Sequence, residues 1–242
     1  MPSSRGRLVA AAICLALMAP VGAVVAQQEE HSPGPGDPAG SGQLGALDEA
    51  YRDAFDLAPG WLDLGEDESG RTVLEDGHVY MSVIGPDANY WDYVVLPSAS
   101  EVMRVEATVQ MDGSASTAAG PACGSAVGLP RWFVAGINGG DEWWLGRLID
   151  GRLQVVDRGG LGAASSTQSA LRVAIECASA PSEGGDHVLI TVDDRLVAAS
   201  MPVLDIPVGP YDKAGLLIAT DAQQGSATFD DLIVHTGEPL AR

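Results

Sequence analysis

The chain has 242 residues, of which 33 are acidic and 13 basic, and its formal net charge at pH 7 is −20. A surface this acidic repels phosphate backbones and anionic lipid headgroups, which argues against nucleic acid and membrane surfaces as partners. A net charge of this size favours solubility but does not indicate a particular ligand or reaction. Function must therefore be inferred from motifs in the sequence.

Residues 1–26 have the three parts of a secretory signal peptide. Arg5 and Arg7 give a positive start, Leu8 to Leu17 form an apolar core, and small residues end the segment at Ala26. No other stretch approaches the roughly 18 consecutive apolar residues of a membrane-spanning helix. We therefore expect cleavage after Ala26 and a secreted, extracellular product without membrane contact. Two of the 13 basic residues leave with the signal, so the mature net charge is 11 − 33 = −22.

Residues 27–43 are rich in proline, glycine, serine and charge, and such a composition cannot bury a core. We expect a disordered linker there and one domain over residues 44–242, a length within the usual single-domain range. The first residues of this domain, 44–55 (LGALDEAYRDAF), suit a short helical turn that leads into it.

Alternation of apolar and polar residues dominates the rest of the chain, and it is the pattern of half-buried β-strands. Strands are expected at residues 78–84, 89–96, 101–111, 171–177, 187–192, 214–220 and 226–235. Asp150-Gly151 and Asp193-Asp194 each separate two such segments and predict two-residue hairpin turns. About ten to twelve strands without helical periodicity predict an all-β fold, an antiparallel two-sheet jelly-roll sandwich.

Two cysteines, Cys123 and Cys177, remain after removal of the signal, which takes Cys14 with it. An even pair in an exported chain favours a disulfide, although two buried free thiols are the alternative. Cys177 shares the inward face of its strand with Ile175, where a bridge would be protected. The enclosed loop of 54 positions (177 − 123) predicts a stabilisation of about 4 kcal/mol in the chain-entropy model.

The aromatic residues suggest a ligand site. On a strand, Trp143 and Trp144 point to opposite faces, so one can belong to the core while the other is exposed. An exposed indole beside carboxylates suits a sugar, whose apolar ring face stacks while its hydroxyls form hydrogen bonds. The candidate ligand-binding residues are Trp143, Trp144, Trp91, Arg147, Asp141 and Glu142. With only 13 aromatic residues in the sequence, the interpretation that all of these rings fill the core is favoured over a ligand site.

An adjacent acidic pair, Asp230-Asp231, interrupts the strand SATFDDLIVH (226–235). The apolar positions Ala227, Phe229 and Leu232 show that the alternation slips by one residue there. A β-bulge produces such a slip, and aspartate tolerates its irregular backbone. Paired carboxylates also suit calcium, but a calcium site needs six or more oxygens, so the bulge is favoured and calcium stays an alternative.

The order of the segments resembles a known family. Phe55-Asp56 and Gly60-Trp61 are followed by EDGHVYMSV (75–83), the alternating strand to Met111, ACGSAVGL (122–129), EWWLGRLIDGRLQVV (142–156) and SATFDDLIV (226–234). This order is similar to that of the concanavalin A-like, laminin-G-like jelly rolls of exported bacterial proteins. The resemblance implies a two-sheet jelly roll, often a binding or accessory module, and does not fix a ligand.

The sequence departs from the catalytic relatives of this fold. Family 16 glycoside hydrolases carry Glu-x-Asp-x-Glu on one strand, whereas the nearest acidic cluster here, Glu66-Asp67-Glu68, alternates between faces. His31, His78, His187 and His235 lack zinc-ligand spacing. The sequence therefore predicts a non-catalytic module without a cofactor that binds carbohydrate or cell-envelope polymer. A glycosidase-like hydrolase with an unrecognised site, and a structural or adhesive domain that uses calcium, are the alternatives.

Overall fold

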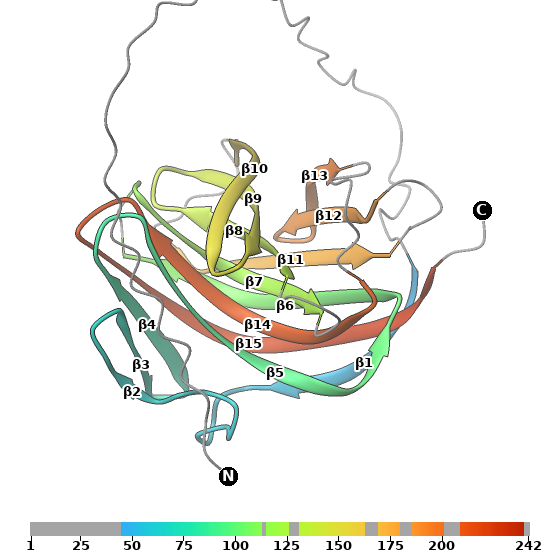
Figure 1. Cartoon of the computed structure of the whole chain (residues 1–242), viewed down its shortest axis with the longest axis horizontal. Coiled ribbons are helices and arrows are strands. Elements are labelled where there is room, and N and C mark those ends of the chain that lie inside the picture. The colour runs from blue at the N-terminus through green and yellow to red at the C-terminus, as the bar shows by residue number, and fades with distance from the viewer. Residues whose placement is uncertain are drawn as a thin grey trace, which may run out of the picture. The chain divides into compact units, whose positions relative to one another are not determined.

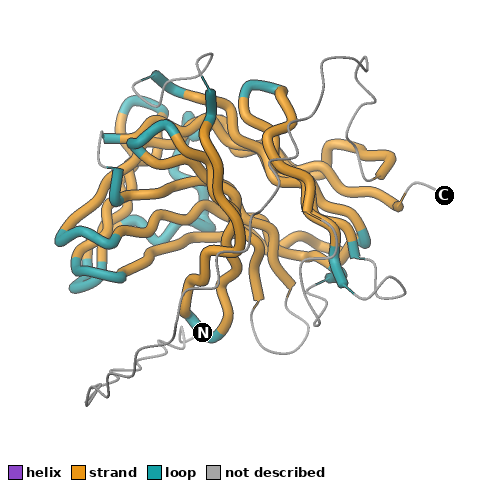
Figure 2. Tube along the Cα trace, turned by 90° about the horizontal axis from the view of Figure 1, so that it is seen from above, coloured by secondary structure: helices purple, strands orange, loops and turns teal. Residues whose placement is uncertain are grey.

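The computed structural model describes residues 45–112, 115–125, 131–162, 169–179, 185–200 and 209–239. The expected signal peptide and linker lie outside these residues, and the boundaries of the domain stay a prediction. The described residues belong to the compact unit Ala39–Arg242 and contain fifteen strands and no helix (Figure 1). They therefore supply no helical segment that could cross a membrane. Figure 2 shows the strands, in orange, joined mainly by short turns.

Nine strands form the first sheet, which we call sheet A. Its strands are β1 (Gly45–Asp53), β2 (Gly65–Glu66), β3 (Gly70–Glu75), β4 (His78–Ile84), β6 (Val102–Met111), β11 (Leu171–Ala178), β12 (His187–Val192), β13 (Arg195–Ser200) and β15 (Gln224–Pro239). They lie in the order β13-β12-β11-β6-β15-β4-β3-β2, and β1 also pairs with β15. All of the pairings are antiparallel, as the alternating pattern predicted.

Six strands form the second sheet, sheet B. They are β5 (Ala88–Ser100), β7 (Thr117–Ser125), β8 (Arg131–Asn138), β9 (Glu142–Ile149), β10 (Arg152–Gly160) and β14 (Tyr211–Thr220). Their order is β10-β9-β8-β7-β14-β5, again with antiparallel pairing throughout. The predicted all-β, two-sheet architecture is confirmed.

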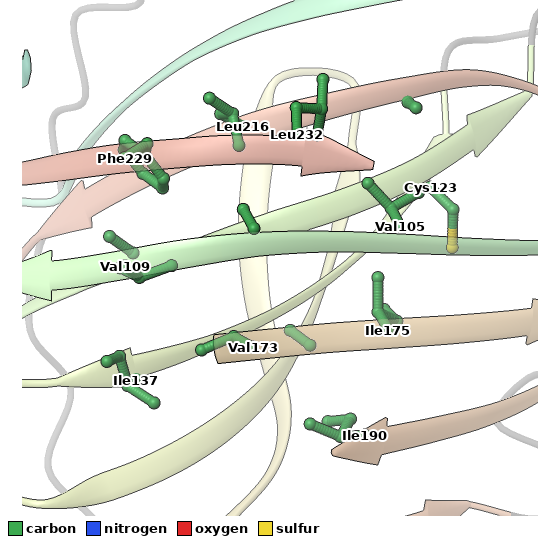
Figure 3. Close-up of a cluster of buried hydrophobic side chains, with 14 of the residues drawn as sticks. Val105, Val109, Cys123, Ile137, Val173, Ile175, Ile190, Leu216, Phe229 and Leu232 are labelled. Atoms are coloured by element: carbon green, nitrogen blue, oxygen red, sulfur yellow. The ribbon is translucent and has the colours of Figure 1, made fainter. Parts of the chain in front are cut away.

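The main core lies between the sheets. Val105 and Val109 of β6 have no exposed surface and pack in the same cluster as Ile137 and Leu216 of sheet B (Figure 3). Full burial of side chains of this size contributes about 1.5–3 kcal/mol each, so the alternating strands account for the cohesion of the two sheets. A disulfide joins Cys123 of β7 to Cys177 of β11, which confirms the predicted bridge and shows that it links one sheet to the other.

The turns and the bulge also agree with the sequence. Asp150-Gly151 and Asp193-Asp194 both have positive φ at each residue (53° and 75°, 49° and 60°), as tight hairpin turns between twisted strands require. In β15 the register shifts between Asp230 and Ile233, and Asp231 has φ 52°. The predicted β-bulge is therefore confirmed.

The helical turn expected at residues 44–55 is wrong, because Gly45–Asp53 forms strand β1. This strand pairs with Leu232–Pro239, the part of β15 that follows the bulge. Leu, Ala, Glu and Arg favour helix, but that preference amounts to only a few tenths of a kcal/mol per residue. The backbone hydrogen bonds that β1 forms with β15 outweigh this preference.

Candidate functional site

A second apolar cluster covers the face of sheet B that points away from sheet A, which we call the outer face. Along β8, Phe133 and Ala135 belong to the main core, whereas Trp132 and Val134 alternate with them and belong to the second cluster. The cluster consists of Ala122, Trp132, Val134, Trp144, Leu148 and Leu217, each at most 4% exposed. A sheet face without a covering layer usually carries polar residues, so this burial needs a cause.

Two indole rings of this cluster lie against glycines of their own and neighbouring strands. A Cβ atom at Gly124 would lie 2.5 Å from the ring of Trp132. At Gly136 it would lie 2.6 Å from Nε1 of Trp144, and at Gly146 2.5 Å from the far edge of the same ring. The glycines are therefore what allows the two rings to settle onto the sheet. Trp91 is partly buried against the same cluster.

Tyr93 continues this aromatic surface toward solvent. Its ring centroid lies 5.1 Å from that of Trp132, and its side chain is 38% exposed. The ammonium group of Lys213, the one lysine in the sequence, lies 5.1 Å from the centroid of the Tyr93 ring. We call Trp91, Tyr93, Trp132 and Trp144 the outer aromatic cluster.

Curling of sheet B buries Trp132 and Trp144 of this cluster. Asn89 lies on edge strand β5, and Gly151 lies in the β9–β10 turn at the other edge, yet Asn89 Nδ2 donates to the Gly151 carbonyl oxygen at 3.4 Å. In a flat sheet β5 and β9 would lie four strand spacings apart, about 19 Å. Pairing also places Asn89 level with Asn138, at the other end of the strands from Gly151. Diagonal corners of the sheet therefore meet over its outer face.

An open cleft of about 390 Å³ remains where these corners meet. It is lined by Asp87, Ala88, Asn89, Gly151, Arg152, Leu153, Val155, Ala219, Thr220 and Asp221. Leu153, Val155 and Ala219 make it apolar on one side, and exposed Asp87, Arg152 and Asp221 supply charge around it. Leu153 and Ala219 also pack against the outer aromatic cluster, so the cleft and the cluster are continuous.

Two buried polar atoms on this face lack a partner among the described residues. Asn89 Oδ1 accepts no hydrogen bond, and Trp144 Nε1, in the cluster, donates none. Leaving such an atom unpaired costs about 1–3 kcal/mol. The exposed charged side chains around the cleft, Asp87, Arg152 and Asp221, suit a hydroxyl-bearing molecule better than an apolar one.

The candidate tryptophans are both buried. Trp143 and Trp144 point to opposite faces, as predicted, but they are only 8% and 4% exposed, which agrees with the interpretation that the rings are buried and not with an exposed indole at either position. Trp143 lies in the main core and Trp144 in the outer cluster. The curl of sheet B covers the outer face, which a flat half-buried sheet would leave open. The structure does bring Trp91 and Trp144 into one cluster.

The polar candidates do not line the cleft. Asp141 has φ 59° in the β8–β9 turn, and Glu142 Oε2 accepts from Asn138 Nδ2 at 2.9 Å in the same turn. Arg147 Nε donates to Gln154 Oε1 at 2.8 Å across the β9–β10 hairpin. The cleft residues Asp87, Asn89, Arg152 and Asp221 were missed. One signal could have found Asn89, because it alternates with Trp91 on β5 and so shares its face.

The acidic pair of the bulge lies in sheet A. Asp230 Oδ1 accepts from the Asp231 backbone N–H at 2.9 Å, and Asp230 Oδ2 lies 3.4 Å from His78 Nδ1. Within the described ranges no group of three or more His, Cys, Asp or Glu residues could hold a metal ion. The contacts of Asp230 are those of a carboxylate that supports an irregular strand.

A polar cleft of about 280 Å³ opens on the outer side of sheet A, with Glu106, Arg172, Arg52 and Asp231 among its lining residues. Glu106 is 4% exposed and accepts from Arg104 Nε and Arg172 Nε, both at 2.8 Å. Burial favours the neutral acid, but the hydrogen bonds and charges of Arg104 and Arg172 outweigh it and lower the pKa of Glu106. Both of its oxygens are engaged, so this carboxylate serves the fold.

No family model matches the sequence, and no curated protein matches it. Solved structures do share its fold. The β-glucanase of Bacillus licheniformis aligns with a TM-score of 0.52 at 9% identity, over 81% of this chain and 100% of its own. The laminarinase catalytic domain of Thermotoga maritima MSB8 gives 0.53 at 9% identity, over 78% and 98%. The CBM2 module of an evolved Dit from Lactobacillus casei BL23 phage J-1 gives 0.51 at 12% identity, over 82% and 99%.

Identities this low establish the fold and leave the ligand open. Fifteen antiparallel strands in two stacked sheets, aligned over almost the whole length of these structures, settle the architecture. The chain has the concanavalin A-like jelly-roll fold.

Proposed function

We propose that this protein is an exported, non-catalytic module that binds saccharide in the cleft beside the outer aromatic cluster. The observation that carries the proposal is an open cleft of about 390 Å³ whose lining combines apolar and polar side chains, among them Leu153, Val155, Asn89, Asp87, Arg152 and Asp221. The amino-terminal signal pattern supports export, and the missing Glu-x-Asp-x-Glu strand supports binding without hydrolysis.

The chemistry of the cleft matches a sugar ring. Leu153 and Val155 offer an apolar wall against which the C–H face of a pyranose packs, and Asp87, Asp221 and Arg152 can hydrogen-bond its hydroxyls. A purely apolar ligand would gain little binding free energy here, because it could not form hydrogen bonds with the polar part of the lining. The structural neighbours include a β-glucanase and a laminarinase, and these names select β-glucans as the first ligands to test.

A glycan array probed with residues 27–242, with and without calcium, tests the proposal and identifies the sugar. Val155 and Val156 provide a matched pair of variants, because both are exposed (61% and 39%) but only Val155 is among the residues that line the cleft. We expect Val155→Asp and Asn89→Ala to weaken saccharide binding about tenfold or more by calorimetry. Val156→Asp should bind like the unmodified protein.

An array without saccharide signal in either condition would contradict the proposal. Equal affinities for Val155→Asp and Val156→Asp would move the site away from this cleft. Unfolding curves of the three variants, compared with that of the unmodified protein, check that a lost affinity is not lost structure.

A further inference from the structure

The outer face of sheet B is closed to a polymer lying along it. Trp132 and Trp144, which would be the stacking platform of an open groove, are only 3% and 4% exposed. A glycan chain needs exposed ring faces over several consecutive sugar units to lie on such a surface. The middle of the face offers none, because its own side chains fill it.

The cleft is also bounded on the side where the sheet corners meet. Asn89 and Gly151 both line it, and the hydrogen bond between them joins β5 to the β9–β10 turn. A saccharide that entered here would meet this bridge and the side chains of Leu153 and Ala219, which pack against the buried rings of the outer face. The cleft therefore has room for a few sugar units and is bounded on the side of this bridge.

We infer that this module recognises the end of a saccharide chain, or a short free saccharide, rather than an internal segment of a polysaccharide. The inference rests on the proposed function and adds the class of ligand. The charged residues around the cleft also indicate the charge of the ligand. Asp87 and Asp221 outnumber Arg152 around the cleft, and the whole chain carries −20, so the bound end is neutral rather than carboxylated or sulfated.

Partial hydrolysis of a polysaccharide separates end recognition from internal recognition. Hydrolysis at constant mass raises the number of chain ends and leaves the mass of internal segments nearly unchanged. The probes are linear β-1,3-glucan, β-1,3-1,4-glucan, xylan and mannan, each intact and partly hydrolysed, with matched oligosaccharides from dimer to decamer. Binding sites per gram are measured by calorimetry with residues 27–242.

We expect the number of sites per gram of the bound glycan to rise in proportion to its chain ends. We also expect the oligosaccharide Kd to stop improving after the first few units. The signal should be lost in Val155→Asp and kept in Val156→Asp. Sites per gram that stay constant through hydrolysis would overturn the inference while leaving saccharide binding intact. Absence of binding to every intact and hydrolysed probe would instead overturn the proposed function, and the inference with it.

Discussion

Glu106 is a buried carboxylate whose charge is compensated by two guanidinium groups. Arg104 donates to its Oε1 atom and Arg172 to its Oε2 atom. His235 Nε2 lies 3.5 Å from the same Oε1 atom. Arg104 also donates to Thr191 Oγ1, so the group spans three neighbouring strands and β15. The Arg104 side chain is only 14% exposed, so removal of Glu106 would leave a largely buried guanidinium with Glu176, 3.7 Å away, as its remaining carboxylate.

The unfolding free energy should therefore decrease as the pH is lowered, because Glu106 becomes protonated. Its pKa in the folded protein lies below the ordinary value of 4.5, so its contribution is present above about pH 4.5 and is lost as the pH falls through the lowered folded pKa. Glu106→Gln should cost about 3 kcal/mol at pH 7 and flatten the acid limb of the stability profile. Urea unfolding between pH 7 and pH 3 measures both effects.

Glu49→Gln is the matched control for this prediction. Glu49 also pairs with an arginine, Arg52, but both side chains are largely exposed and the pair is screened by water. We expect no measurable change in unfolding free energy for this variant. If the two substitutions behave alike, the buried group around Glu106 does not stabilise the fold as described.

Strand β15 shows how one irregular position organises a whole element. Before the bulge it pairs with β4 through Gln224–Phe229, and after it with β1 through Leu232–Pro239. On its other side β6 follows it along both parts. The bulge at Asp230-Asp231 thus marks the point where β15 exchanges one neighbour for another, and the slip restores the inward direction of Leu232 and Val234.

Substitutions at Asp231 should separate backbone from side-chain effects. Its φ of 52° is one that glycine adopts freely and that β-branched residues resist. We expect Asp231→Gly to be close to neutral and Asp231→Val to destabilise by about 1–2 kcal/mol in urea unfolding. Equal stability of the two variants would show that backbone conformation is not what selects aspartate here.

The same variants test the calcium alternative. A bulge that only serves the strand predicts a melting temperature independent of calcium concentration, since an ion stabilises a protein only if it binds the folded state. A calcium-dependent rise that disappears in Asp231→Gly would assign the acidic pair to a metal site instead.

The described residues form two sheets, which a disulfide joins. Cys123 lies in sheet B and Cys177 in sheet A, 54 residues apart in sequence. Both cysteines are fully buried in the main core, so the link closes a large loop without replacing any apolar packing. Its contribution comes chiefly from restricting the unfolded chain.

Replacing both cysteines by alanine should lower the unfolding free energy by about 4 kcal/mol while preserving the β-sheet spectrum under native conditions. Urea unfolding with circular dichroism measures the change. The reduced form of the unmodified protein serves as the control and should lose a similar amount. A double variant as stable as the oxidised protein would show that the link contributes nothing to the folded state.

Local sequence determined the strands, the hairpin turns, the bulge and the disulfide, because each depends on residues close together along the chain or on the redox compartment. Period-two alternation, Asp150-Gly151 and the slip at Asp230-Asp231 act through neighbouring backbone positions. Intrinsic preference failed at Gly45–Asp53, where pairing with β15 makes a strand of helix-favouring residues. The local pattern also predicted about ten to twelve strands, whereas the described residues contain fifteen, because short strands such as β2 and β3 are too brief to show alternation.

Only the tertiary structure decided how the outer face of sheet B is used. The contact between Asn89 and Gly151 joins residues 62 positions apart, and it exists because twist accumulates over six strands until diagonal corners meet. That curl buries Trp144, which the sequence left free to be exposed, and creates the cleft at Asn89. No short segment encodes such a curvature, since it is the sum of many small rotations between strands.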